Sequence, residues 1–283
     1  MTIEVVDPGP LTTIQDLGRR GWAHLGVPRA GAADRASAAR ANRLVGNDVG
    51  AALLETTMGG VTFVTRCAVT IAVTGAHCDV MADGRHVHWG KPVTVPAGRR
   101  VRVGPAHAGV RSYVAVRGGI DVQPVLGSRS TDTLSWVGPP RVVAGTALRA
   151  GTATGRPAAV DVVVPPDLAG PAILRVWRGA RADWLAPEQW DALDGAEAKV
   201  GPDSDRIGLR LQGVELRRRE GEVPTEGIVL GAVQVPPSGE PVVFLADHPT
   251  TGGYPLVGVV DDRDLNRCAQ LRPGETMRLR VMG

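Results

Sequence analysis

The stretch that decides the fold runs from residue 242 to residue 260 and reads VVFLADHPTTGGYPLVGVV. Its two apolar runs, 242–246 and 256–260, are rich in β-branched residues and predict strands. The loop between them holds an acid, an imidazole, two hydroxyls, two glycines and a phenol, which is more chemistry than a chain reversal requires. We therefore expect a hairpin whose loop, Asp247 to Tyr254, contributes to a functional site.

Composition predicts a mainly β protein. The 283 residues are 43% hydrophobic, enough for a substantial core, and include 37 glycines and 22 prolines, a balance that suits short strands joined by tight turns. Three helices are predicted, at 34–46, 187–193 and 261–271, and the first has Asp34 as a natural N-cap. Short strands are predicted at 2–6, 53–57, 61–65, 68–74, 79–82, 85–89, 101–103, 112–116, 160–164, 173–177, 209–211, 228–235 and 277–281. An Asp83-Gly84 type I′ turn is expected between two of them.

Two similar halves are predicted from a repeated pattern. Residues 95–103 and 271–279 each place a Pro-and-Gly turn before an alternating strand, and residues 145–166 are poor in large apolar groups. We expect an N-terminal domain at 1–160 and a C-terminal domain at 161–283. The terminal segments could also interleave, because strands from opposite ends of a chain can share one barrel.

Charge and composition argue against several classes of protein. The formal net charge is only +3, and the arginines are scattered among acids, so no clustered basic face for nucleic acid is predicted. No apolar run approaches the roughly 20 residues of a membrane span, and no leader is apparent, so we expect a cytoplasmic protein without a membrane segment. His77, His86 and His88 lack further ligands at a recognisable spacing, so no metal site is expected.

Three further loops carry more polar groups than a turn needs. Gln15, Asp16 and Arg19 follow a Pro-Gly turn and are candidates for a pocket or a partner interface, although an ion pair across a bend would explain the two charged residues as well. The loop 127–131 can hold a carboxylate or phosphate through hydroxyl, amide and guanidinium donors. The third loop places Arg206 between acids, where a solvated turn with local ion pairs is the simpler explanation.

Seven separated motifs resemble the signatures of one family. They are V-x-P-G-x-L-T-T-I-Q-D-L-G-R at 6–19, G-V-P at 26–28, A-N-x-L-V-G-N at 41–47, G-S-R-S-T at 127–131, S-D-R-I-G-x-R-L at 204–211, G-A-V-Q-V-P at 231–236 and T-T-G-G-Y-P at 250–255. The family is that of allophanate hydrolase subunit 2, which includes the C-type subunit of 5-oxoprolinase and the matching part of the urea carboxylase carboxyltransferase domain. Each motif alone is weak, but all seven occur in the right order along nearly the whole chain.

The resemblance implies two cyclophilin-like β-barrel domains with a few short helices. It also implies a partner similar to allophanate hydrolase subunit 1, which is also known as the B-type subunit of 5-oxoprolinase, and a third subunit of the lactam-utilisation type. The leading activity it implies is ATP-dependent opening of 5-oxoproline to glutamate. Two alternatives remain open. One is a carboxyltransferase component that acts on urea or a related amide, and the other is a non-catalytic regulatory subunit that binds a partner.

The cofactors that these interpretations need must come largely from other chains. No Gly-x-x-x-x-Gly-Lys-Ser/Thr loop is present, and neither Lys91 nor Lys199 lies in a phosphate-binding context, so ATP is expected to be bound wholly or partly by partner subunits. Neither lysine resembles a Met-Lys-Met biotinylation hairpin. Under the carboxyltransferase alternative, carboxybiotin would therefore be delivered by a partner.

Candidate site residues follow from motif position and side-chain chemistry. Asp247 is a candidate base or water-positioning group. The side chains that could orient an amide are those of Gln234, Thr250, Thr251 and Tyr254. The two glycines of the loop allow positive φ and could offer backbone amides to developing negative charge. Replacing Arg206 by Ala is expected to abolish activity with little loss of thermal stability. The candidates for substrate binding are Arg206, Arg129, Ser130, Thr131, Thr250, Thr251, Gly252 and Gly253.

Overall fold

The computed structural model describes residues 1–159, 168, 170 and 172–283, which belong to two compact units. The first unit comprises Met1–Arg19, Ala30–Asp132 and Trp136–Leu168, and the second comprises Arg20–Arg29, Thr133–Ser135 and Ala169–Gly283. The strand predicted at 160–164 and the domain limit predicted at residue 160 lie outside the described residues, so both stay predictions.

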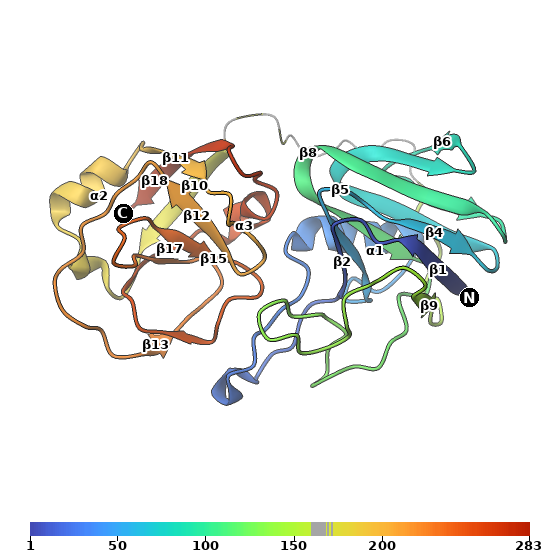
Figure 1. Cartoon of the computed structure of the whole chain (residues 1–283), viewed down its shortest axis with the longest axis horizontal. Helices are drawn as coiled ribbons and strands as arrows, with labels where there is room; N and C mark the ends of the chain where they lie inside the picture. Colours follow the sequence, from blue (N-terminus) through green and yellow to red (C-terminus); the bar gives the residue numbers. More distant parts are fainter. Residues whose placement is uncertain (160–167, 169, 171) are drawn as a thin grey trace. The chain divides into compact units, whose positions relative to one another are not determined.

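The first unit is built around a twisted sheet that contains nine strands among the described residues (Figure 1). One path through it runs β2-β3-β8-β4-β1-β9, and β5 pairs with β8 and also with β6 and β7. The strands are β1 (Thr2–Asp7), β2 (Leu11–Gln15), β3 (Leu53–Thr57), β4 (Thr62–Thr65), β5 (Val69–Ala82), β6 (Arg85–Val87), β7 (Val93–Val95), β8 (Arg100–Val116) and β9 (Ala147–Arg149).

Strands β5 and β8 are longer than the sequence pattern predicts. The separate strands expected at 68–74 and 79–82 are both part of β5, and those expected at 101–103 and 112–116 are both part of β8. The ladder between β5 and β8 shifts register between Gly75 and Val80, as bulges do, and such shifts let a long ribbon bend without ending. The turn that joins β5 to β6 has positive φ at Asp83 (47°) and Gly84 (75°), which confirms the predicted type I′ turn.

Helix α1 (Arg35–Val45) packs on β5 and β8 of the first unit. It begins as predicted, because the Asp34 carboxylate accepts hydrogen bonds from the Ser37 amide (2.9 Å) and the Ser37 hydroxyl (2.6 Å). It ends at Gly46, whose φ of 75° is the left-handed conformation of a C-terminal cap. Its buried face, including Ala41 and Leu44, joins Tyr113 in a core cluster.

The second unit contains a closed barrel in the order β10-β17-β14-β15-β12-β11-β18, with the ladder closed by β10 beside β18. Alternate residues of these strands, such as Leu174, Leu209 and Leu279, point into its core and are at most 2% exposed. The strands are β10 (Ala172–Arg178), β11 (Glu197–Val200), β12 (Gly208–Gln212), β14 (Ala232–Gln234), β15 (Val242–Phe244), β17 (Leu256–Val260) and β18 (Thr276–Met282).

Shorter elements complete the second unit. A two-stranded ladder outside the barrel pairs β13 (Glu226–Gly227) with β16 (Thr251–Gly252). Helices α2 (Pro187–Leu193) and α3 (Asp262–Cys268) lie at or near their predicted positions, and two turns of 3₁₀-helix are η1 (Ala23–Leu25) and η2 (Ala182–Trp184). The expectation of a mainly β fold with barrels and a few short helices is confirmed. Across the described residues, no helix combines the length and apolar character needed to cross a membrane.

The hairpin predicted at 242–260 is wrong in one respect. Both strands form, as β15 and β17, but they do not pair with each other, because β14 lies between them. Val233 of β14 is opposite Val243 on one side and Gly258 on the other. The loop therefore crosses over the end of β14 instead of closing a hairpin. A local strand-loop-strand pattern cannot reveal a third strand inserted between its two members.

Candidate functional site

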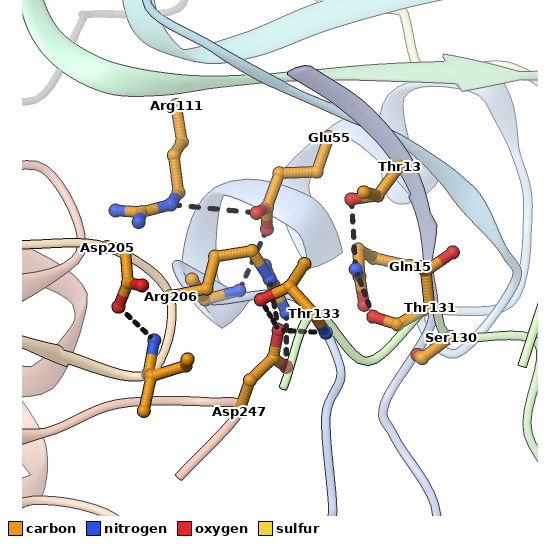
Figure 2. Close-up of polar contacts among 12 residues, drawn as sticks. Thr13, Gln15, Glu55, Arg111, Ser130, Thr131, Thr133, Asp205, Arg206 and Asp247 are labelled. Atoms are coloured by element: carbon orange, nitrogen blue, oxygen red, sulfur yellow. Dashed lines mark hydrogen bonds and ion pairs between the residues drawn. The ribbon is translucent and has the colours of Figure 1, made fainter. Parts of the chain in front are cut away.

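Asp247 lies at the centre of a buried polar cluster in the second unit (Figure 2). Its carboxylate accepts two hydrogen bonds from Arg206, Nε to Oδ2 at 2.8 Å and Nη2 to Oδ1 at 2.9 Å, in the bidentate geometry that strengthens such pairs. Thr133 adds its amide (2.9 Å) and hydroxyl (2.7 Å) to Oδ2. The side chains of Arg206 and Asp247 are 2% and 0% exposed. Four donors and one full positive charge thus hold this carboxylate.

This pairing changes what is expected of Arg206. A buried pair that loses one member leaves an uncompensated charge, which is strongly destabilising. The backbone also ties the two residues together, because the Asp247 amide donates to the Arg206 carbonyl at 3.0 Å. The sequence-based expectation that Arg206→Ala would cost little stability is therefore replaced by the opposite prediction.

His248 follows Asp247 and is also buried, with 8% of its surface exposed. Its Nδ1 lies 2.7 Å from the Pro249 carbonyl oxygen, and its ring is tilted against Phe244 with the centroids 6.4 Å apart. Burial lowers the pKa of His248 below its usual value, although the Pro249 carbonyl and Asp247 act in the opposite direction. The imidazole is therefore held in its neutral form over a wider pH range than a free histidine.

Gln234 and Tyr254 line one cavity of about 270 Å³ in the second unit. The cavity is bounded by Asp205, Arg210 and Phe244 among others, so acid, cation and aromatic groups all reach it. The Gln234 Nε2 donates to the Tyr254 carbonyl oxygen at 3.3 Å, and the Tyr254 side chain is 44% exposed. The structure thus brings together two of the four residues predicted to orient an amide.

The glycines of the 250–255 loop do not behave as expected. Neither Gly252 nor Gly253 adopts the positive φ that glycine allows. A Cβ atom at Gly252 would lie 2.8 Å from Ile228 Cδ1 and 2.9 Å from Gln234 Nε2, so the ends of these two side chains would have to shift. Pairing in β16 keeps this backbone extended. Thr250 accepts at its carbonyl from Ile228, and Gly253 faces open space.

Asp16 organises a second polar cluster, in the first unit. Its Oδ1 accepts from the hydroxyls of Ser128 (2.6 Å) and Ser130 (2.5 Å) and from the Gly18 amide (2.7 Å), and its Oδ2 accepts from the Arg129 amide (2.6 Å). The Asp16 amide returns a hydrogen bond to the Ser130 hydroxyl at 2.9 Å. A single half-buried carboxylate therefore binds all three residues of the 128–130 segment, two through their hydroxyls and one through its backbone amide.

Arg129 and Thr131 use the same segment differently. The Arg129 side chain donates from Nε to the Val122 carbonyl (2.8 Å) and approaches Asp121 at 3.8 Å, while 40% of it stays exposed. Thr131 is buried, donating its amide to the Ile14 carbonyl (2.9 Å) and its hydroxyl to the Pro139 carbonyl (2.9 Å). The guanidinium thus remains accessible to an anion, whereas the threonine is committed to the fold.

Gln15 is fully buried beside this cluster, and only one end of its amide is satisfied (Figure 2). Its Nε2 donates to the Thr13 hydroxyl (3.0 Å) and to the Thr131 carbonyl (2.8 Å), which determines the orientation of the amide. The Oε1 atom is buried and accepts no hydrogen bond from the described residues. Buried acceptors without partners are uncommon in folded proteins and call for an explanation.

Arg19 also contacts the polar cluster around Asp16. Its guanidinium donates from Nη2 to the Ser130 carbonyl and lies 3.5 Å from the Val125 carbonyl through Nε. The predicted Asp16–Arg19 ion pair is not among the contacts that hold either side chain. Gly138 makes room for this arrangement, because a Cβ there would collide with the Ser130 carbonyl and lie 2.7 Å from Arg19 Nη2.

A sequence profile of the family described as carboxyltransferase domain, subdomain A and B, matches residues 25–281. The chain belongs to this family. One relative, the C-type subunit of 5-oxoprolinase from Escherichia coli (strain K12), is 34% identical over 282 residues, which cover 96% of this chain and 89% of that protein. The resemblance inferred from the seven motifs is confirmed.

Two larger relatives contain the same carboxyltransferase unit. Urea amidolyase of Saccharomyces cerevisiae is 33% identical over 303 residues, which cover 98% of this chain but only 16% of that protein. The solved structure of Kluyveromyces lactis urea carboxylase aligns with all of this chain at a TM-score of 0.91 and 28% identity, and 27% of that chain is covered. This chain therefore spans most of its 5-oxoprolinase relative, and about a quarter or less of the two urea enzymes.

In this carboxyltransferase-family chain the predicted residues fall into separate groups. Gln15, Asp16, Arg19, Arg129, Ser130 and Thr131 lie together in the first unit. In the second unit Arg206 pairs with Asp247, while Gln234 and Tyr254 line the cavity and are joined by a hydrogen bond. Within the described parts of the chain, no group of three or more His, Cys, Asp or Glu residues could hold a metal ion.

Three polar residues of this family member were not predicted from the sequence to belong to a site. Thr133 donates to Asp247, but the sequence around it, Thr-Leu-Ser at 133–135, is typical of a surface and does not predict this contact. Glu55 and Arg111 form a buried pair at 3.6 Å with 1% and 4% exposure, and Glu55 also accepts from the Ala33 amide at 2.9 Å (Figure 2). The sequence does indicate Glu55 and Arg111 as unusual, because each is a charged residue in a run that is otherwise typical of a core strand.

Proposed function

We propose that this chain is a subunit of a multi-subunit, ATP-dependent enzyme that opens 5-oxoproline to glutamate. The observation that carries the proposal is the match to the C-type subunit of 5-oxoprolinase, which covers 96% of this chain and 89% of the relative. The correspondence runs nearly end to end, unlike the match to one part of urea amidolyase. A lactam is a poor electrophile because of amide resonance, so coupling its opening to ATP hydrolysis is chemically sensible.

Gln15 supports a role for this chain in binding an amide. Its Oε1 is buried, its orientation is held by Thr13 and Thr131, and no described residue donates to it. A lactam N–H would supply the missing donor. We assign Gln15 as the acceptor for that N–H, and Arg129, with its accessible guanidinium, as the candidate for the substrate carboxylate.

Roles in the second unit are proposed on the same basis. Gln234 and Tyr254 remain candidates to orient an amide, and Thr250, Thr251, Gly252 and Gly253 remain candidates to bind substrate beside them. Asp247 was a candidate base, but four donors already occupy its carboxylate. We therefore propose that Asp247 and Arg206 position loops and do not touch the substrate. Ser130 and Thr131 have the same positioning role in the first unit.

ATP is proposed to bind mainly on partner subunits. Helix α1 begins at Asp34 and helix α3 at Asp261, and each of these carboxylates accepts from an amide of the first turn. A phosphate at either helix terminus would meet a negative charge in place of free N–H groups. The proposed partners are a protein similar to the B-type subunit of 5-oxoprolinase and a third subunit of the lactam-utilisation type.

The proposal is tested by reconstitution. The chain is purified with the two candidate partners, and glutamate release from 5-oxoproline is measured with and without ATP. Release that requires all three chains and ATP supports the proposal, and no release with all three present rejects it. Gln15→Met, which keeps the side-chain length, should raise the KM for 5-oxoproline, whereas Gln212→Met, on β12, should not. An unchanged KM in the Gln15 variant would contradict the role of Gln15 alone.

A second candidate function is carboxyl transfer to urea or a related amide. The match to Kluyveromyces lactis urea carboxylase over the whole chain favours it. Carboxybiotin would then come from a partner, since neither lysine of this chain lies in a biotinylation motif. Bicarbonate- and biotin-dependent carboxylation of urea by the reconstituted complex, without glutamate release from 5-oxoproline, would favour this alternative.

A further inference from the structure

The first unit has a cavity of its own, which differs in character from the one that Gln234 and Tyr254 line in the second unit. Its volume is about 600 Å³, within the range of pockets that bind small organic molecules. Its lining is predominantly apolar and includes Ile14, Val122, Pro139, Pro140, Val142 and Leu148. No residue predicted from the sequence to bind substrate contributes to it.

The walls of this cavity are held in place by hydrogen bonds. The Thr131 amide and hydroxyl donate to the carbonyls of Ile14 and Pro139, each at 2.9 Å, and the Val142 amide donates to the Thr12 carbonyl at 3.0 Å. On another side, Val125 pairs with Ser128, whose hydroxyl is bound by Asp16. A cavity whose walls are fixed in this way loses little entropy when a ligand enters.

Among the described residues that line the cavity, Arg141 alone is charged. Its side chain is exposed, and it forms no hydrogen bond or ion pair with any described residue. Val125 and Val143, also in the lining, are 38% and 48% exposed. An apolar interior with one uncommitted guanidinium is complementary to a molecule that has an apolar body and one negative end.

We propose that this cavity binds a small monocarboxylic acid with an aliphatic or aryl body, whose carboxylate pairs with Arg141. The apolar body removes the lining from water, and the guanidinium selects an anion over a neutral or cationic analogue of the same shape. The site is independent of the function proposed above. Its wall nevertheless includes Ile14 and Pro139, whose carbonyls accept hydrogen bonds from Thr131. The Thr131 carbonyl in turn accepts from Gln15, so a bound acid would be linked to Gln15 through Thr131.

The experiment measures binding of three matched probes to the full chain by calorimetry: 4-phenylbutyrate, 4-phenylbutanol and 4-phenylbutylamine. We expect the acid to bind roughly two- to five-fold more tightly than the alcohol, the value of one partly exposed ion pair, and the amine to bind most weakly. Arg141→Gln should reduce the affinity for the acid to that for the alcohol and leave the alcohol unchanged. Arg85→Gln, an exposed arginine of β6 outside the lining, should change neither.

A second variant tests the cavity itself. Ala147 is an exposed residue in the lining, so Ala147→Phe fills the space without forcing a ring into the core, and it should abolish binding of both acid and alcohol. Thermal unfolding checks that each variant is folded. The proposal is overturned if the acid does not bind, if acid and alcohol bind equally to the natural chain, if Arg141→Gln leaves their ratio unchanged, or if Ala147→Phe still binds them.

Discussion

Asp247 and Asp16 both organise polar loops, but they do so with different partners. Asp247 is fully buried and faces the guanidinium of Arg206, with Thr133 completing its coordination. Asp16 is only half-buried and is held by two serine hydroxyls and two backbone amides, and no cation of the described part of the chain pairs with it. A charge removed completely from water needs an opposite charge, whereas a charge that keeps some solvent can be held by neutral dipoles.

The largest effect is expected when the buried pair is broken. Asp247→Ala removes the buried carboxylate that pairs with Arg206 and accepts from Thr133, so the free energy of unfolding should fall by about 3 to 5 kcal/mol. Chemical denaturation of the full chain measures this. The matched control is Asp183→Ala, which breaks an exposed pair with Arg219 at 2.9 Å and should cost at most about 1 kcal/mol. Equal losses in the two variants would contradict the contrast between buried and exposed pairs.

A smaller loss is expected from Asp16→Asn. The amide keeps one acceptor oxygen, but its NH₂ group then faces donors where a carboxylate oxygen had accepted, so stability should fall by about 2 kcal/mol. Asp48→Asn is the control, because Asp48 is exposed and its carboxylate accepts, among the described residues, only from the Gly50 amide (2.7 Å), in a turn that asparagine also makes. If Asp16→Asn proved as harmless as the control, the proposed anchoring of the 128–130 segment would be wrong.

A substitution at Gly138 tests the cluster around Asp16 by introducing a steric clash with Ser130 and Arg19. Its φ is 111°, and a Cβ would collide with the Ser130 carbonyl and approach Arg19, so Gly138→Ala should destabilise the chain by more than about 1 kcal/mol. Gly145, with a φ of 85° and open space around it, separates backbone strain from collision. Gly145→Ala should be the milder of the two in thermal unfolding, and the reverse order would remove the steric argument.

The smallest expected effect is a dependence of stability on pH, caused by His248, the residue that follows Asp247. Burial lowers the pKa of His248 in the folded chain, so below the ordinary histidine value of about 6.5 the unfolded chain takes up a proton that the folded chain resists. Stability should therefore fall as the pH drops from 7.5 to 5.5, and His248→Asn should remove part of that fall. Denaturation curves at the two pH values would refute this if the variant kept the full difference.

Local features were predictable from the sequence because short-range chemistry decides them. Asp34 caps helix α1 through Ser37, three residues away, and Gly46 ends it. Asp83 and Gly84 form a type I′ turn between adjacent strands. In each case the partners are near in sequence, so residue type and spacing suffice to identify the structure. The mainly β class follows from the same local patterns repeated along the chain.

Residue types and their spacing were thus enough to predict the class of fold, the helix ends, the tight turns and the family. Only the tertiary structure decided that β14 separates β15 from β17, that Thr133 binds Asp247, and that Ser130 binds Asp16. In both polar pairs the partners are 114 residues apart in the chain. Such contacts depend on how the cores pack, because burial of apolar side chains provides most of the free energy that brings distant strands together. A sequence motif shows only which polar groups are available to interact once folding brings the distant strands together.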